Sequence, residues 1–403
     1  MTALALIFAL AAADRRPVDS LAALQARIDT ARPGDAIVVR NGEYTASAPI
    51  AVRARGAAGK PVRIMAESAG GVTLRGTDGF DVAPEAAYVV IDGFVFAHQS
   101  GKTQIRQGAS HIRITHSVFA CTGDGAYLTI AADDTEIDRS EFRDKRTPGN
   151  MIDVRGAGSQ VAQRVHIHDN YFHDFTSPGP GTNGAETIRF GLSGLSMSKG
   201  LGTIERNLFV RCTGENEMLS IKSGSNIIQD NTLLDSPGAQ LTLRHGNGNI
   251  VRRNYLRGTD GIRVFGDRNR VESNYFEANT GAIQIGNGDG EVADGAPLTS
   301  HDRPDEVFIT LNVLVNNVRN IFMSRRDKGL GATRVTVAHN VIQGGGPAAY
   351  IDGPFPEPIW RDNSVWQTPL GLMPSEGTTS RPRAIQPPKP LTAQDLLKTI
   401  RRR

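Results

Sequence analysis

The sequence is poor in cysteine, in aromatic residues and in excess charge, and each shortage excludes a class of protein. Two cysteines are too few for a small fold held together by disulfides. Aromatic residues make up only 6% of the 403 residues, which predicts a core of narrow layers filled by Val, Ile, Leu and Ala. The formal net charge is +3, from 45 Lys and Arg against 42 Asp and Glu. Such a balance does not indicate a nucleic-acid partner.

Long apolar runs are also missing, so we expect no membrane-spanning segment. The one notable run extends from Ala3 to Ala13 and ends in small residues. Ala11 and Ala13 are suitably placed for cleavage by a signal peptidase. We therefore predict a signal peptide at residues 1–13 and a periplasmic or secreted protein.

What the sequence does contain is a repeat. An apolar residue, two intervening residues, Asn or Ser, one further residue and a second apolar residue recur along the chain, as in ITHSVF, IHDNYF, IQDNTL, VRRNYL and VESNYF. The commonest spacing between these phrases is 20–24 residues. Short runs that alternate apolar and polar residues lie between them, as in MLSIKS, LTLRHG and GIRVFG. Alternation with a period of two indicates strands.

Short strands, turns rich in Gly and Asn, and a fixed period predict a right-handed parallel β-helix, an all-β solenoid. We expect it to span residues 14–373. The Asn of each phrase is expected to lie at a turn, in the left-handed conformation, and to form a ladder with the Asn of the next coil. A helix at residues 20–31 would cap the N-terminal end. Residues 374–403 are expected to form a Pro-rich, basic strap with a short terminal helix.

The repeat also bears on the two cysteines. Cys121 and Cys212 each follow a repeat phrase, and three phrase intervals separate them. At about 4.8 Å per coil they would lie about 14 Å apart. A disulfide requires Cα atoms within about 7 Å of each other. We therefore predict that both cysteines are free.

Aligning the alternating runs places one outward side chain on each coil. Leu219 and Ile221 would point inward, so Lys222 would point outward, and the same logic applies to the neighbouring runs. The predicted outward column consists of Arg189, Lys222, Arg244, Arg263 and Gln284. Cations in one column repel one another, which indicates an anionic polymer lying along them. Chance, with solvent counterions, is the alternative.

Two acidic residues precede this column in the segment GENE. Glu215 and Glu217 lie two apart, so on an extended chain they face the same way. Such crowding is unfavourable unless a cation or a shared proton relieves it, and calcium prefers oxygen ligands. Strict alternation would direct both away from Lys222, so we infer a corner between Glu217 and Leu219. An ordinary exposed acidic turn is the alternative to a metal site.

These stretches resemble polysaccharide lyase family 6, the family of alginate lyases and chondroitinase B. The similarity is carried by NGAETIRFG (183–191), GENEMLSIKSGSNIIQDNT (214–232), LTLRHGNGN (241–249) and DGIRVFG (260–266). ARPGDAIVVRNGEYT near the start is similar as well, so that the resemblance extends from about residue 20 to about residue 370.

The resemblance implies a calcium-assisted β-elimination of a uronate polymer and a role for each matching residue. Lys222 matches the general base and Arg244 the general acid. The matching calcium ligands are Asn183, Glu215 and Glu217, and the matching substrate contacts are Arg189, His245 and Arg263. The stretch from Lys222 to Arg244 is one residue longer than the family pattern. We expect the extra residue at the turn 237–240, with the strand register preserved.

Alternatives remain at this stage. A β-helix that binds glycans without cleaving them would explain the repeat and the basic column, but not the acidic and basic residues at family spacing. A glycoside hydrolase needs a carboxylate pair flanking the scissile bond, which Glu215 and Glu217 are too crowded to provide. The Asp-Pro-His sequence that resembling epimerases carry is absent. The expected partner is an acidic polysaccharide, either alginate or dermatan sulfate, bound by a monomer. We expect the insertions 143–166 and 287–307 to decide between them.

Overall fold

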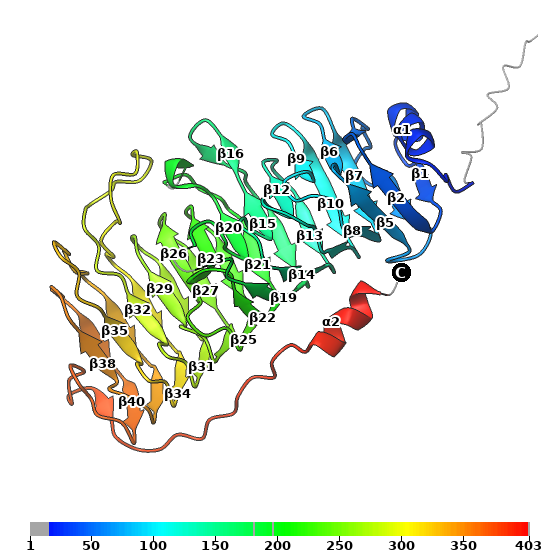
Figure 1. Ribbon diagram of the computed structural model, residues 1–403. Helices are drawn as coiled ribbons and strands as arrows, with labels where there is room; N and C mark the ends of the chain where they lie inside the picture. The colour runs from blue at the N-terminus through cyan, green and yellow to red at the C-terminus, as the bar shows by residue number, and fades with distance from the viewer. Residues whose placement is uncertain (1–15, 180–181, 196, 402–403) are drawn as a thin grey trace, which may run out of the picture.

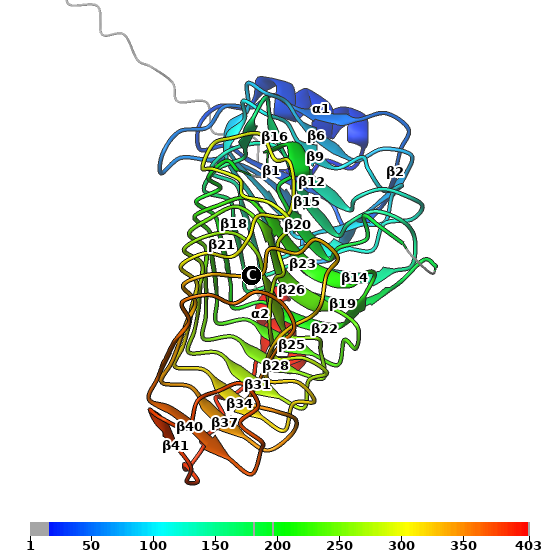
Figure 2. The same cartoon turned by 90° about the vertical axis from the view of Figure 1, so that its left-hand side faces the viewer.

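Parallel strands dominate the chain and form three long sheets. A computed structural model describes residues 16–179, 182–195 and 197–401, so the predicted signal peptide lies outside the described residues. Sheet A has 13 strands, from β1 (Ala36–Val39) to β39 (Ile359–Arg361). Sheet B has 14, from β2 (Gly42–Ala46) to β41 (Thr378–Thr379), and sheet C has 12. Successive coils stack along one axis (Figure 2). This is the predicted parallel β-helix.

Each coil contributes one strand to each sheet in turn, as β21 (Thr203–Glu205), β22 (Leu208–Thr213) and β23 (Glu217–Lys222) do to sheets A, B and C. Sheet C matters most for the site. Its strands, in spatial order, are β3 (Ile50–Val52), β6 (Phe80–Val82), β9 (Gln104–Ile105), β12 (Leu128–Ile130), β15 (Ile152–Val154), β20 (Ile188–Phe190), β23, β26 (Gln240–His245), β29 (Ile262–Val264), β32 (Ile283–Ile285), β35 (Ile321–Met323) and β38 (Ala349–Ile351).

The core is built of parallel columns of equivalent apolar residues, each column taking one residue from each coil. The expectation that small aliphatic residues fill it is only half right. In the N-terminal half, phenylalanine rings stack at centroid distances of 4.3, 4.5, 4.8 and 4.8 Å along Phe96, Phe119, Phe142, Phe172 and Phe209. Leu233 and Leu256 continue the column in the next coils. The aromatic residues are few, but the repeat concentrates them in one stack.

A buried asparagine ladder joins consecutive coils where sheet A turns into sheet B. At each step the backbone N–H and the side-chain amide of one Asn donate to the side-chain oxygen of the next, as Asn231 does to Asn254 at 3.0 Å. The ladder was predicted, but the left-handed conformation was placed one residue too late. The residue before the Asn adopts it, as in Asp230 (φ 55°) and Arg253 (φ 53°). The Asn is thereby left free to bond along the stack.

Both ends of the chain cover part of the solenoid (Figure 1). Helix α1 (Leu21–Thr30) closes the N-terminal end and buries Leu24 and Ile28, with the Ser20 hydroxyl as its N-cap. After β40 (Asn363–Trp366) the chain returns along sheet B to helix α2 (Ala393–Ile400). Leu396 and Ile400 of α2 pack against a patch made by Tyr171, Leu208 and Val210. Among the described residues, no helix is long and apolar enough to cross a membrane.

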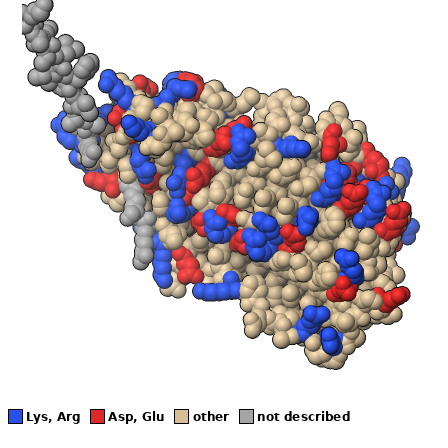
Figure 3. Space-filling view, turned by 180° about the vertical axis from the view of Figure 1, so that it is seen from behind, with Lys and Arg blue, Asp and Glu red and all other residues tan. Residues whose placement is uncertain are grey.

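Cys121 and Cys212 are buried and free, as predicted. The acidic and basic side chains on the surface are intermixed, and the face seen in Figure 3 carries no broad area of one sign. The near balance of charge is therefore also a local balance on that face.

Candidate functional site

The residues of the predicted outward column lie on strands of sheet C, but they form two rows rather than one column. Arg189 pairs across the strands with Ser220, which pairs with Thr242, and Thr242 pairs with Arg263. Gln284 follows Arg263 in this row. Lys222 and Arg244 lie further along their strands. The prediction of a single column is wrong because β23 has two outward residues, Ser220 and Lys222. The prediction chose Lys222 for its charge, whereas Ser220 is the residue in register with Arg189.

Two irregularities in strand pairing set the direction of the key side chains. Glu217 pairs with Gln240 and Leu219 with Leu241, so Met218 is an extra residue in β23. The inferred corner is therefore absent: β23 continues through this point, and the bulge brings Glu217 to the same side as Ser220. A second shift pairs Lys222 with His245 and leaves Arg244 without a partner in the register. The register was thus not preserved at Arg244. Such bulges re-aim side chains.

Glu217, on β23, connects the arginines of the next two strands, β26 and β29. Its Oε1 accepts hydrogen bonds from Arg244 at 2.5 Å and from Arg263, and its Oε2 accepts one from the Ser220 hydroxyl at 2.6 Å. The carboxylate is 4% exposed. Burial would raise the pKa of Glu217, but the guanidinium groups of Arg263 and Arg244 outweigh it and hold the pKa below its usual value. Glu217 is therefore a carboxylate at neutral pH, and the two arginines share it.

Lys222 contacts a carboxylate that the sequence analysis missed. Its Nζ lies 3.2 Å from Oε1 of Glu186, a fully buried residue whose Oε2 accepts a hydrogen bond from Asn150 at 2.6 Å. Glu186 precedes the inward-facing Ile188 by two positions, which would place a charge in the core. That mismatch between an acidic residue and an inward position was the signal available in the sequence. Gly191, with φ 95°, adopts a left-handed turn directly against the Lys222 carbonyl oxygen, which a side chain there would obstruct.

Three carboxylates converge beside Lys222. Glu186, Glu215 and Glu217 each place an oxygen within 4.8 Å of the others. Glu215 accepts hydrogen bonds from the backbone N–H groups of Gly184 at 2.6 Å and Ala185 at 3.0 Å. Burial, followed by the charge of Glu186, raises the pKa of Glu215. Convergent oxygen donors under mutual repulsion suit a hard cation such as calcium.

Asn183, the third predicted ligand, is exposed and directly precedes Gly184. Its connection to the three carboxylates is indirect, through the backbone N–H of the adjacent Gly184, which donates to Glu215. Arg189 lies on β20, two strands from Arg244, and forms two hydrogen bonds of 2.9 Å with Asp153 on β15. The predicted column of uncompensated cations is therefore corrected, since each of its basic residues has a carboxylate partner.

Two histidines complete the site, and only the first was predicted. His245 is 4% exposed, and its Nδ1 has no hydrogen-bond partner among the described residues. Burial, together with His301, Arg244 and Lys222, lowers the pKa of His245 to about 3. The ring of His301 lies 5.5 Å from the His245 ring and comes from the connection between β32 and β33 (Phe308–Thr310). Nothing in the sequence singles out His301, because only the fold of that connection brings its ring to sheet C.

Loops flank the outward face of sheet C on both sides, and we call the face between them the trough. On the side of sheet B, a hollow of 640 Å³ lies beside Glu215 and is lined by residues that include Ser177, Thr182, Asn216 and Pro237. On the side of sheet A, the connection 287–307 rises from the stack (yellow in Figure 1). It lies beside Leu195 and Met197 of an earlier coil. A polymer lying across the strands would pass between these walls.

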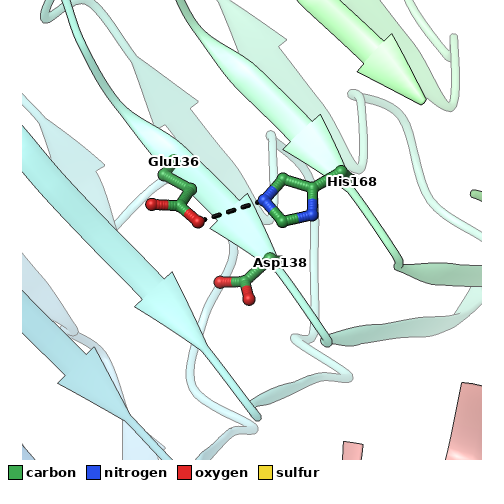
Figure 4. A group of neighbouring side chains, drawn as sticks. All are labelled: Glu136, Asp138 and His168. Atoms are coloured by element: carbon green, nitrogen blue, oxygen red, sulfur yellow. Dashed lines mark hydrogen bonds and ion pairs between the residues drawn. The ribbon is translucent and has the colours of Figure 1, made fainter. Parts of the chain in front are cut away.

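A second acidic group with a histidine lies on sheet A, away from this trough (Figure 4). Glu136 and Asp138 belong to β13 (Glu136–Asp138) and His168 to β18 (His166–His168). Both imidazole nitrogens are engaged, Nε2 by Glu136 at 3.0 Å and Nδ1 by Asp169 at 2.6 Å. Burial would lower the pKa of His168, but these hydrogen bonds raise it to about 9. With both ring nitrogens engaged by carboxylates, and with Asp138 paired to Arg113 and Arg139, these residues form an ion-pair network.

Comparisons with known proteins identify the family of the chain. The sequence model of the chondroitinase B family matches residues 18–328. The solved structure of AlyGC, described as a family PL6 alginate lyase, superposes with a TM-score of 0.81 at 26% identity, covering 94% of this chain and 56% of AlyGC. The chain thus spans about half the length of that neighbour.

Two further structures share the fold. A family 6 lyase from human gut microbiota, described as specific for mannuronic acid, has a TM-score of 0.77 at 24% identity, with 90% of this chain and 89% of its own covered. A PL6 polysaccharide lyase from Pseudopedobacter saltans has a TM-score of 0.76 at 22% identity, with 94% and 97% covered. No curated protein matches the chain. Because the family model covers most of the sequence, the chain belongs to the chondroitinase B family, polysaccharide lyase family 6.

Proposed function

We propose that the protein is a polysaccharide lyase that cleaves a uronate-containing polysaccharide, with alginate as the first substrate to consider, by calcium-assisted β-elimination. The observation that carries the proposal is the convergence of three carboxylates with Lys222, Arg244 and Arg263 on the outward face of sheet C. The 26% identity with AlyGC over nearly the whole chain supports alginate. We further propose that residues 14–373 form the lyase domain and that it acts as a monomer in the periplasm or outside the cell.

In this reaction Lys222, as the neutral amine, takes the proton from C5 of the uronate. The C5–H electrons form the C4–C5 double bond, and the bond from C4 to the glycosidic oxygen breaks. Arg244 donates hydrogen bonds to the departing oxygen, whose negative charge it stabilises. A guanidinium is a poor proton donor because its pKa is above about 12. His245 is neutral at neutral pH, since its pKa is about 3. Water therefore supplies the final proton.

The residues present fit a calcium ion. Glu186, Glu215 and Glu217 converge there and would hold it. Asn183, the other proposed ligand, lies on the exposed segment just before Gly184 and would add a fourth oxygen donor. When bound, calcium neutralises the uronate carboxylate and stabilises the charge that develops beside it. Arg189, His245 and Arg263 would contact the sugars along the trough. Arg189 is fixed by Asp153 and Arg263 by Glu217, so both guanidinium groups are held in place before the substrate arrives.

The experiment that tests the proposal is the ultraviolet absorbance of unsaturated uronate ends, followed while the purified protein acts on alginate and, separately, on dermatan sulfate. Each polymer is tested with calcium and with a chelator. A calcium-dependent rise on alginate supports the proposal in full. A rise only on dermatan sulfate would favour the second candidate substrate, which the family model's description suggests. No rise on either polymer, with the protein folded, would contradict lyase action and favour glycan binding alone.

Two variants test the residue roles. We expect Lys222→Ala to abolish turnover while the protein still binds polymer in affinity electrophoresis, and normal turnover would refute the base assignment. Replacing Glu215 and Glu217 together by Ala should remove both the activity and the calcium-induced rise in melting temperature. A double variant that stays active in chelator would refute the assignment of these carboxylates to calcium.

A further inference from the structure

The connection 287–307 is closed at its neck, and His301 lies there. The backbone N–H of His301 donates to Oδ1 of Asp289 at 2.8 Å, and the N–H of Asp289 donates to the His301 carbonyl at 3.0 Å. Asp289 also pairs with Arg326, which extends from the next coil. These contacts fix the backbone of His301 beside the strands of sheet C.

The contacts of the imidazole define its tautomer. Nη2 of Arg326 lies 3.0 Å from Nδ1 of His301, and a guanidinium can only donate. Nδ1 is therefore the acceptor, and the proton of the neutral ring is on Nε2. Within the described residues, Nε2 has no hydrogen-bond partner. The ring thus presents one N–H group that the protein itself does not use.

The ring of His301 lies beside residues of the candidate site. Its centroid lies 5.5 Å from that of His245 and 5.1 Å from that of Phe265, whose ring also lies under the Arg263 guanidinium. Burial, Arg244 and Arg326 lower the pKa of His301 to about 4. The ring is consequently uncharged at neutral pH, and its side chain is 23% exposed.

Contacts away from the ring also hold the connection. Its tip is held by Asp294, which accepts hydrogen bonds from Asn247 at 2.6 Å and from Arg268 at 2.9 Å. Its base is held by Asp302, which accepts from the Val292 N–H at 2.8 Å. The partly exposed ring accepts from Arg326 through Nδ1, but its Nε2–H donor has no structural partner among the described residues.

We propose that His301 is a further substrate-contacting residue, whose Nε2–H donates to a hydroxyl or carboxylate oxygen of the sugar bound beside Arg244. This inference rests on the proposed function, because the ligand it names is the same acidic polysaccharide. It assigns the connection 287–307 a direct part in holding the polymer. The connection 287–307 would then influence which polymer is bound through one uncharged hydrogen-bond donor, and not through additional positive charge.

The test compares His301→Phe, which keeps a ring but has no donor, with His301→Gln, whose amide retains one. Thr299→Ala is the control, since Thr299 is an exposed residue of the same connection. Circular dichroism confirms that each variant is folded. For the polymer that the wild-type protein cleaves, we expect the Phe variant to raise KM about tenfold, with a smaller change in kcat. The Gln variant should recover part of the loss, and the control should match the wild type.

Polymer binding is measured in parallel by affinity electrophoresis in alginate and in dermatan sulfate, so the test does not require turnover. Weaker retardation of the Phe variant than of the control supports the inference. Equal retardation and a KM within about twofold of the wild type would overturn it while leaving the lyase assignment intact. A wild-type protein that binds but does not cleave would instead overturn the proposed function. His301 would then still be tested by the binding result.

Discussion

Replacing Glu217 by Gln removes the one charge that two arginines share. The glutamine oxygen can still accept from Arg244 and Arg263, and its NH2 group can donate to the Ser220 hydroxyl where Oε2 accepted from it, so the change is mainly electrostatic. Glu217 is 4% exposed and Arg263 16%, so solvent screens the remaining guanidinium groups only weakly. Removing one partner of a buried ion pair costs about 3–5 kcal/mol. Because the hydrogen-bond acceptor survives, we expect the lower end, about 3 kcal/mol of unfolding free energy.

Urea unfolding in chelator, followed by circular dichroism, measures this loss without any contribution from bound metal. Asp81→Asn is the matched control: Asp81 also faces outward on sheet C and bonds Arg106 at 2.6 and 2.8 Å, but Arg106 is 49% exposed. An exposed pair contributes at most about 1 kcal/mol. Adding Arg263→Gln to the Glu217 variant should recover about 1–3 kcal/mol, because it removes an uncompensated charge. A Glu217→Gln protein as stable as the control variant would refute the reasoning.

The remaining predictions concern Glu186 and the protonation of two other groups. Glu186→Gln removes the carboxylate that lies 3.2 Å from Nζ of Lys222. We expect kcat to fall with little change in polymer binding, and an unchanged kcat would separate Glu186 from the reaction. The pKa of His168 is raised to about 9, from about 6.5 in an unfolded chain, so its stabilisation is complete below about pH 6.5 and is lost as pH rises through about 9. His168→Gln should therefore lower the melting temperature at pH 6 and have little effect at pH 10, and a constant difference would contradict this. Burial and the nearby Glu291 and Asp294 raise the pKa of Asp302 to about 6. The contribution of Asp302 to the free energy of unfolding is present below about pH 4 and is lost as pH rises through 6. Asp302→Asn, which carries no charge at any pH, should therefore raise the melting temperature at pH 8 but not at pH 4.

Much of the fold could be predicted because the same sequence pattern recurs in successive coils of a solenoid. One Asn at a fixed place in each phrase is enough to define the turn, since each Asn bonds to the next, as Asn231 does to Asn254. The same periodicity shows that Cys121 and Cys212 are too far apart for a disulfide. Information summed over about a dozen coils outweighs the ambiguity of any single short strand.

The site departs from the repeat, and there the sequence was a weaker guide. The extra residues Met218 and Arg244 are bulges whose effect depends on the pairing of particular strands, so alternation alone misplaced Glu217 and paired Lys222 with the wrong neighbour. Glu186 was missed because the alternating pattern assigns apolar residues to inward positions, and Glu186 is an acid at such a position. His301 lies in a connection without periodicity, and only its fold brings the ring to sheet C.

The C-terminal strap has a consequence for how the molecule comes apart. In a solenoid each coil contacts only its neighbours, so coils at a free end can detach one by one. Here α2 packs on Tyr171 and Leu208 in the middle of the stack, although its tether begins beyond the last coil. The last coil therefore cannot separate far without first pulling the helix from that patch. The coils from about residue 171 to residue 366, which carry Glu186, Lys222 and His301, are closed into one cooperative unit, while the N-terminal coils remain free to unfold on their own.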